Sequence, residues 1–176
     1  MMPLYRRLLG TEFDHLPGQV RALHDTTTAT SWSGRADVVR GTSLGARVLA
    51  TLFRLPPQGL DQVLTVTFEP KGRAEVWTRM FGAKHFVSTQ RASGEQLLET
   101  VGPCTLHMSL HTGGDGLALK VVAARILGLP VPRFLLPRIR TLETERDGRY
   151  TFDVEAAIPA FGQLVHYRGW LERDAS

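Results

Sequence analysis

The chain has 176 residues, of which 43% are hydrophobic and 22% are charged, and this composition excludes a wholly disordered protein. The length fits one domain and leaves no comfortable room for two. The net charge of +4 comes mostly from arginines that are dispersed along the chain. Nucleic-acid-binding proteins concentrate basic residues on one face, so we expect no nucleic-acid partner.

Two short helices are predicted at the start of the chain. Pro3 suits the first position of a helix, leucines recur after it at helical spacing, and Gly10 is a suitable end. Pro17 begins a second helix, which ends at His24. The polar tract 25–31 that follows predicts a loop.

A strand and a third helix follow before residue 55. Residues 32–40 alternate between apolar and polar side chains, which is typical of a strand. Thr42 or Ser43 caps a helix. An apolar stripe on this helix consists of Leu44, Val48, Leu49 and Leu52. We expect the three helices to plug or cover the concave side of a sheet.

Residues 62–172 alternate with a period of two almost without interruption, which predicts a series of strands joined by short turns. One of these turns is expected at Gly113–Gly116. The segment Gly128–Pro132 cannot continue a central strand, and a helical turn is expected at 133–136. Short connections favour antiparallel pairing, and a sheet of about ten such strands tends to curl or close.

We therefore predict an α+β fold in a single domain, 1–176, with a helical part at 1–55. The main element is a curved antiparallel β-sheet of about ten strands, forming a barrel or half-barrel of the helix-grip or calycin-like kind, with two or three N-terminal helices. A barrel of this size often encloses a ligand cavity. Whether the sheet closes is left open.

Recognisable catalytic, metal-binding and nucleotide-binding motifs are missing from the sequence, so we expect no metal and no cofactor. Cys104 is the single cysteine, so an internal disulfide and a cysteine-based zinc site are excluded. His107 and His111 lie four apart on a predicted strand, about 13 Å from each other, and cannot hold one metal together. We find no signal peptide and no membrane span, so we expect a soluble, cytoplasmic protein.

The strand 73–81 raises the main question about a binding site. Its alternation places Trp77 and Arg79 on one face, together with Glu75 and Phe81. If this face points inward, Arg79 can present its guanidinium to an anionic or carbonyl ligand beside Trp77. If it faces solvent, Arg79 lies across Trp77 in a cation–π contact. We favour the solvent-facing interpretation.

Tyr167 and His24 are the other candidates. Tyr167 lies on the more apolar side of the last strand, so its hydroxyl is expected to face inward, toward a ligand or more commonly toward the backbone. His166 and Arg168 are expected to face water. His24 ends a helix, where a protonated histidine is stabilising, and an acid–base role is the alternative.

Several motifs together resemble a bacterial family catalogued as domain of unknown function 4166. These motifs are Leu4–Gly10, Leu16–Pro17, Arg21–His24, Trp77–Arg79, Phe81–Gly82, Gly128–Arg133, Phe152–Val154 and Tyr167–Leu171. The resemblance implies no established activity. Members are similar to a domain that is sometimes attached after a dehydrogenase-like or epimerase-like domain, which implies a separately encoded protein of that kind as a partner.

Three hypotheses follow for the function. The leading one is non-catalytic binding of an apolar or amphipathic small molecule between the sheet and the helices, with Trp77, Arg79, Tyr167 and His24 as candidate ligand-binding residues. The second is an enzyme of cyclase, isomerase or hydrolase type that uses the same cavity. The third is an interaction module that docks on a separate dehydrogenase-like protein through an exposed apolar patch around 134–136.

Overall fold

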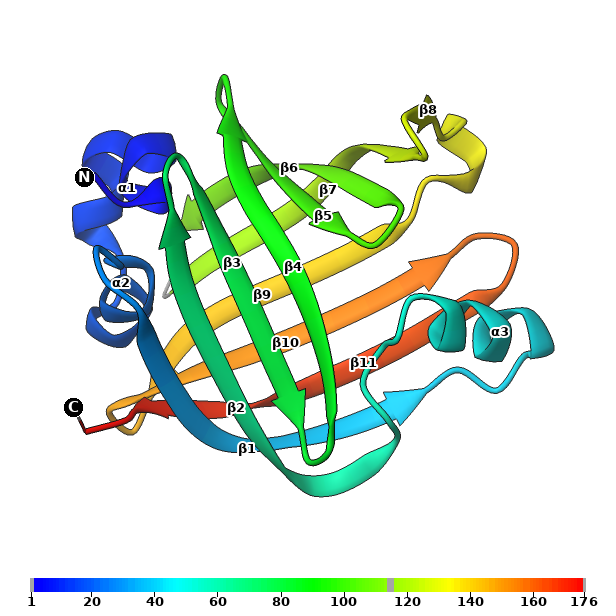
Figure 1. Cartoon of the computed structure of the whole chain (residues 1–176), viewed down its shortest axis with the longest axis horizontal. Coiled ribbons are helices and arrows are strands. Elements are labelled where there is room, and N and C mark those ends of the chain that lie inside the picture. Colours follow the sequence, from blue (N-terminus) through cyan, green and yellow to red (C-terminus); the bar gives the residue numbers. More distant parts are fainter. Residues whose placement is uncertain (1, 114–115, 176) are drawn as a thin grey trace.

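The computed structural model describes residues 2–113 and 116–175 of the chain. Within them, eleven strands form one antiparallel sheet, and ten of the strands close into a barrel (Figure 1). Around the barrel the order is β1 to β7 and then β9, β10 and β11, with β11 paired to β1 and β6 paired to β7. The prediction of about ten antiparallel strands is confirmed, and the question of closure is answered.

The strands agree with the period-two pattern of the sequence. Their bounds are β1 Thr30–Arg40, β2 Gly59–Lys71, β3 Ala74–Phe81, β4 Lys84–Ser93, β5 Gln96–Val101, β6 Cys104–Gly113, β7 Gly116–Ile126, β8 Leu129–Pro130, β9 Arg138–Arg146, β10 Arg149–Ile158 and β11 Gly162–Arg173. Within the described part of the chain, the eleventh strand, β8, pairs only with the end of β7. The predicted turn Gly113–Gly116 includes residues 114–115, which lie outside the described residues.

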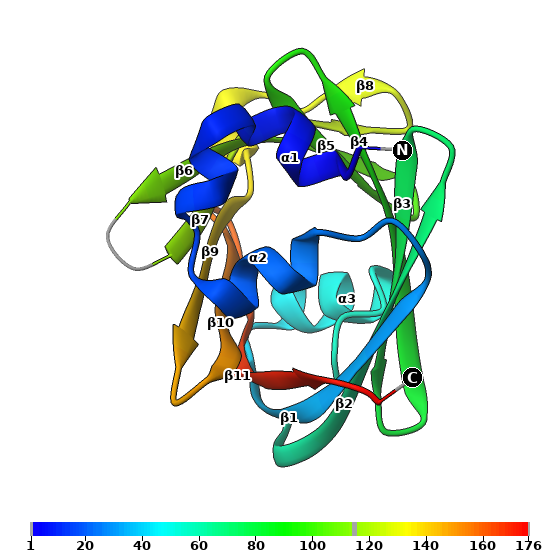
Figure 2. The same ribbon diagram turned by 90° about the vertical axis from the view of Figure 1, so that its left-hand side faces the viewer.

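The helices lie at the two ends of the barrel. Helices α1 (Leu4–Leu9) and α2 (Gly18–His24), with the 3₁₀ helix η1 (Gly10–His15) between them, cover one end, which faces the viewer in Figure 2. Helix α3 (Leu44–Leu52) connects β1 to β2 and lies at the other end, as does the 3₁₀ helix η2 (Arg133–Leu135) in the connection from β8 to β9 (Figure 1). We call these the closed end and the open end.

The inward side chains of the strands and the apolar side chains of α1, η1 and α2 form one core, which includes Leu4, Phe13 and Val20. Two glycines keep the seam between β1 and β11 close. A Cβ on Gly34 would lie 1.9 Å from the carbonyl oxygen of Trp170, and one on Gly169 would lie 2.0 Å from that of Arg35. Glycine is therefore required where these two strands bend together.

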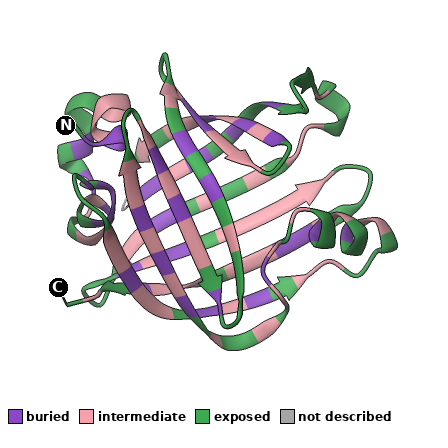
Figure 3. Ribbon diagram, in the orientation of Figure 1, coloured by how far each residue is buried: buried purple, intermediate pink, exposed green. Residues whose placement is uncertain are grey.

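Helix α3 forms where predicted, and the Ser43 side chain caps it by accepting a hydrogen bond from the Ala46 amide at 3.1 Å. Its apolar stripe does not enter the core, however. Leu44 is 78% exposed, and Val48 and Leu52 are also exposed. The buried residues of α3 are Ala46 and Ala50, and Leu49, the fourth residue of the stripe, is half-buried (Figure 3). Helix α3 therefore packs on the barrel mainly through small side chains and leaves most of its larger ones at the surface.

Across residues 2–113 and 116–175, every helix is too short or too polar to cross a lipid bilayer.

Candidate functional site

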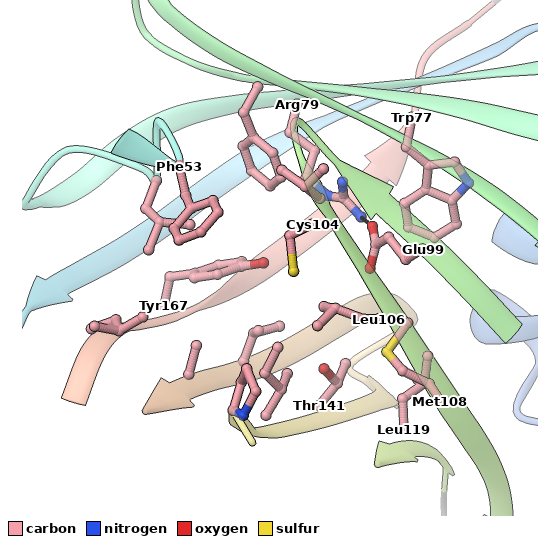
Figure 4. A pocket seen from close by; sticks show the side chains of 18 of the residues that line it. Phe53, Trp77, Arg79, Glu99, Cys104, Leu106, Met108, Leu119, Thr141 and Tyr167 are labelled. Carbon is pink, nitrogen blue, oxygen red and sulfur yellow. Dashed lines mark hydrogen bonds and ion pairs between the residues drawn. The ribbon is translucent and has the colours of Figure 1, made fainter. Parts of the chain in front are cut away.

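The barrel encloses a cavity of about 450 Å³ (Figure 4). Aliphatic and aromatic side chains from most strands and from α3 make up most of its lining. An engineered apolar cavity of about 150 Å³ already binds benzene, and typical small-molecule pockets measure roughly 300–1,000 Å³. The interior is thus not solidly filled by side chains, and it can hold a small molecule.

Strand β3 directs Trp77 and Arg79 into this cavity. The solvent-facing interpretation of the strand is therefore wrong: Glu75, Trp77 and Phe81 are buried and Arg79 lines the cavity. The cation–π contact exists, with the Arg79 guanidinium carbon 4.8 Å from the centre of the Trp77 ring, but it lies inside the barrel. Charged side chains are tolerated there because they have hydrogen-bond partners inside the protein.

Arg79 is held by polar and aromatic neighbours. Its guanidinium donates to the Ser88 hydroxyl at 2.9 Å and to Glu99 Oε1 at 3.3 Å, and it also lies 4.9 Å from the centre of the Phe86 ring. The side chains of Arg79 and Glu99 are only 12% and 15% exposed. The arginine therefore brings a donor group into the cavity with its charge already balanced by one carboxylate.

Tyr167 faces the interior, as its position on the apolar side of the last strand predicted, and its ring extends toward Cys104 (Figure 4). The Tyr167 and Phe81 rings pack edge to face, with their centroids 5.8 Å apart. Burial raises the pKa of Tyr167 to about 12, with Arg79 lowering it and Glu99 raising it. At neutral pH the phenol is therefore protonated and can donate a hydrogen bond to a ligand. On the outer side of the same strand, Arg168 is exposed and His166 is half-buried.

His24 lies outside the cavity. Its Nε2 is 2.5 Å from Glu143 Oε2, and its ring stacks on that of Tyr5 with the centroids 3.7 Å apart. Tyr5 and Glu143 line the cavity, whereas His24 is fully buried beside them. The structure therefore brings Trp77, Arg79 and Tyr167 together at the cavity and leaves His24 one layer behind it.

Further hydrogen bonds join helix α1 to the barrel. The Tyr5 hydroxyl donates to Gln90 Oε1 at 3.0 Å, and the Gln90 amide donates to Glu99 at 3.3 Å. Glu75 accepts from the Leu4 amide at 3.1 Å and from the Trp77 indole at 3.2 Å. Hydrogen bonds therefore attach both Glu75 and the Gln90–Glu99 pair to α1.

Three buried or nearly buried carboxylates give this region a negative potential. Burial raises the pKa of Tyr5 well above 10.0, and the charges of Glu143, Glu99 and Glu75 raise it further. Arg79 is the one charge that acts in the opposite direction. The pKa of Tyr150 is raised in the same way, by burial first and then by Glu143.

Most of this polar cluster is not evident from the sequence, in particular Tyr5, Gln90, Glu99 and Glu143. A signal was present for Glu99, because it lies two residues from Leu97 and Val101 on the inner face of β5. A carboxylate on an otherwise apolar strand face needs a buried partner. The identity of that partner, Arg79 from another strand, depends on the barrel and could not be found from spacing.

Cys104 also lines the cavity, and burial, with a smaller contribution from Glu99, raises the pKa of its thiol. Among the described residues, no group of three or more histidine, cysteine, aspartate or glutamate side chains could hold a metal ion.

Comparison with known proteins supplies the family. A search of curated proteins finds no significant match. The model of the family described as "Domain of unknown function (DUF4166)" matches residues 16–171, which confirms the resemblance seen in the motifs. Because this match spans nearly the whole chain, the protein belongs to the DUF4166 family.

Proposed function

We propose that the protein binds an apolar small molecule inside the barrel without transforming it chemically. The observation that carries this proposal is the cavity of about 450 Å³ with its largely apolar lining. Transfer of apolar surface from water into such a cavity is favourable by about 25 cal/mol for each Å² removed from water.

The polar groups of the cavity define how the ligand would be oriented. Arg79 and Tyr167 are donors that face the space, so a hydrogen-bond acceptor on the ligand would lie near them. The apolar remainder would extend toward the open end, where Phe53 and Leu52 line the cavity. An amphipathic molecule with one small acceptor group fits this arrangement.

The acceptor group should be neutral. The carboxylates of Glu75, Glu99 and Glu143 lie in or beside the cavity. Arg79 already pairs with Glu99, and His24, the other side chain there that can carry a positive charge, already pairs with Glu143. A ligand carboxylate would add a buried negative charge without a free cation to balance it, which is costly in a poorly solvated site. Long-chain alcohols, ketones and esters therefore fit better than the corresponding acids.

A matched set of ligands tests this proposal. We expect a long-chain alcohol and a methyl ester to displace a fluorescent apolar probe at concentrations at least tenfold lower than the acid of equal chain length, at pH 8. Native mass spectrometry before and after solvent extraction would detect a co-purified ligand. If none of the three compounds binds, the proposal that the cavity holds a ligand is refuted. If the acid binds most tightly, the proposal of a neutral acceptor group is refuted.

Two alanines of β7 provide matched variants. Ala124 lines the cavity, whereas the adjacent Ala123 is exposed and does not line it. Ala124→Phe fills part of the space and should weaken probe binding at least tenfold. Ala123→Phe adds the same group to the outside and should leave binding unchanged.

An enzyme of cyclase, isomerase or hydrolase type is the second candidate, favoured by the convergence of Arg79 and Tyr167 on one cavity. The raised pKa of Tyr167 makes it a poor base at neutral pH, which is why binding alone is preferred. Recovery of a bound ligand in unchanged form after prolonged incubation supports binding, and recovery of a product supports the enzyme. The cytoplasmic location and the dehydrogenase-like or epimerase-like partner expected from the sequence remain proposals, for fractionation of cells and co-purification to test.

A further inference from the structure

The cavity opens at the end of the barrel opposite α1 and α2. Several residues both line the cavity and are exposed, and they mark its mouth: Leu52, Ile126, Leu135 and Phe161. They come from α3, from the end of β7 with the connection to β9 that follows it, and from the β10–β11 turn, three segments that lie at the same end of the molecule (Figure 1). We call residues 43–55, 125–138 and 158–162 the mouth surface.

Large apolar side chains are exposed on this surface. They are Leu44, Val48, Leu52, Ile126, Leu127, Leu129, Phe134, Leu135 and Phe161. Three of them, Leu44, Val48 and Leu52, recur every four residues and so share one side of α3. Scattered exposed apolar residues are ordinary, but a group around the opening of a cavity indicates an interaction surface.

The charge of the mouth surface has one sign. It contains Arg47, Arg54, Arg125, Arg133 and Arg138, all exposed, and its three segments contain no aspartate or glutamate. None of the five arginines forms an ion pair with a carboxylate in residues 2–113 and 116–175. The carboxylates that flank these segments along the chain have other partners. Asp37 accepts from the Asp61 amide, Asp61 pairs with Arg35, Glu143 pairs with His24, and Glu155 lies opposite Arg140 on β9.

We propose that the mouth surface docks on an anionic lipid bilayer, so that the cavity opens toward the acyl chains. Exposed apolar side chains insert at the boundary between headgroups and acyl chains, while arginines around them bind lipid phosphates. A second copy of the chain is a poorer occupant, because symmetrical docking would bring five unpaired arginines against five others. Because the apolar cavity opens within this surface, docking would allow an apolar ligand to pass between the membrane and the barrel.

Flotation with lipid vesicles tests this docking on the full chain without any added ligand. We expect the protein to float with vesicles of phosphatidylcholine containing 30% phosphatidylglycerol, to bind pure phosphatidylcholine at least tenfold more weakly, and to lose affinity as salt is raised. One basic residue near an anionic surface corresponds to roughly a fivefold change in affinity. Arg47→Glu with Arg133→Glu should therefore weaken binding at least tenfold.

Charge-matched and apolar controls lie elsewhere on the barrel. Arg91 and Arg146 are exposed outside the mouth surface, and Arg91→Glu with Arg146→Glu should change binding about twofold or less. Phe134→Ser should weaken the part of the vesicle binding that persists at high salt. Val87→Ser, at an exposed position on β4, should leave that part unchanged.

Three outcomes would overturn the docking proposal. They are no flotation with either vesicle, equal losses in the two double arginine variants, and a dimer or a complex with another protein that occupies the mouth surface while vesicles do not bind. The ligand proposal is measured by probe displacement in the absence of vesicles. Failure of one proposal can therefore be distinguished from failure of the other.

Discussion

The two ends of the barrel are built in opposite ways. At the closed end, α1 and α2 bury their apolar side chains, and polar groups that would be costly in isolation are joined into one cluster through Tyr5, His24 and Glu143. At the open end, the buried residues of α3 are both alanines, and larger apolar side chains are exposed beside five arginines that have no ion-pair partner among the described residues. The comparison suggests that the closed end provides stability and the open end provides access to the cavity.

The first prediction removes a partner at the closed end. His24→Ala leaves Glu143 buried without its partner, which typically costs about 3–5 kcal/mol of unfolding free energy. Urea denaturation measures the change. In the control, His166→Ala removes a pair with Asp153 that is partly solvated, and the expected loss is about 0–1 kcal/mol. Equal losses in the two variants would show that the buried cluster does not stabilise the closed end.

The second prediction compares one leucine from a helix at each end. Leu4 in α1 is 2% exposed, and Leu4→Ala should lower the unfolding free energy by about 2–5 kcal/mol. Leu44 in α3 is mostly exposed, and Leu44→Ala should change it by about 0.5 kcal/mol or less. The same denaturation experiment measures both, and a large loss at Leu44 would mean that α3 supports the barrel after all.

Sequence patterns predicted the positions of the helices and strands better than they predicted what surrounds each of them. The alternation of residues 62–172 gave the strands, and Ser43 and Pro17 marked the starts of helices, because these signals are local. The stripe on α3 and the inner stripe of α1 look alike in sequence. Their environments differ because of where the barrel places them: the stripe of α1 packs against the core, and the stripe of α3 lies at the opening.

The candidate site was predicted in part for a related reason. Trp77, Arg79 and Tyr167 were identified as residues of interest, but the face of β3 was assigned wrongly, since a charged residue beside an aromatic one is more often found at the surface. Glu99 reverses this expectation by pairing with Arg79 across 20 positions of the chain. Pairing between distant strands cannot be read from spacing on one strand.

The third prediction concerns alkaline pH. The chain has three tyrosines, and each has a folded-state pKa above the ordinary value of 10.0 because it is buried. Below pH 10 they are protonated in both states, so they give no pH dependence. Above pH 10 the unfolded chain releases protons that the folded chain keeps, so stability falls between pH 10 and 12.

For Tyr167, with its pKa of about 12, the expected loss at pH 11 is on the order of 1 kcal/mol, since one pKa unit corresponds to 1.36 kcal/mol, and Tyr5 and Tyr150 change stability in the same direction. Denaturation at pH 8 and pH 11 measures it. Tyr167→Phe should show a smaller loss between these two pH values than the unmodified chain. Tyrosinate absorbance that rises near pH 10 while the chain is still folded would contradict the prediction.

The smallest expected effect is local to α3. Ser43 caps this helix through Ala46 and donates to the Phe161 carbonyl at 2.7 Å, which links α3 to the β10–β11 turn at the mouth. Ser43→Ala should cost about 1 kcal/mol of helix stability. If α3 opens independently of the barrel, hydrogen exchange should become roughly fivefold faster in α3 alone, while the unfolding free energy of the barrel is unchanged.

Thr42→Ala is the matched control, because Thr42 is exposed and the cap belongs to Ser43. Its exchange should equal that of the unmodified chain. An independently opening α3 would also release a probe from the cavity faster in Ser43→Ala than in Thr42→Ala. If exchange increases equally in α3 and in the closed-end helices, the two ends unfold together and the distinction between a stable end and an access end is lost.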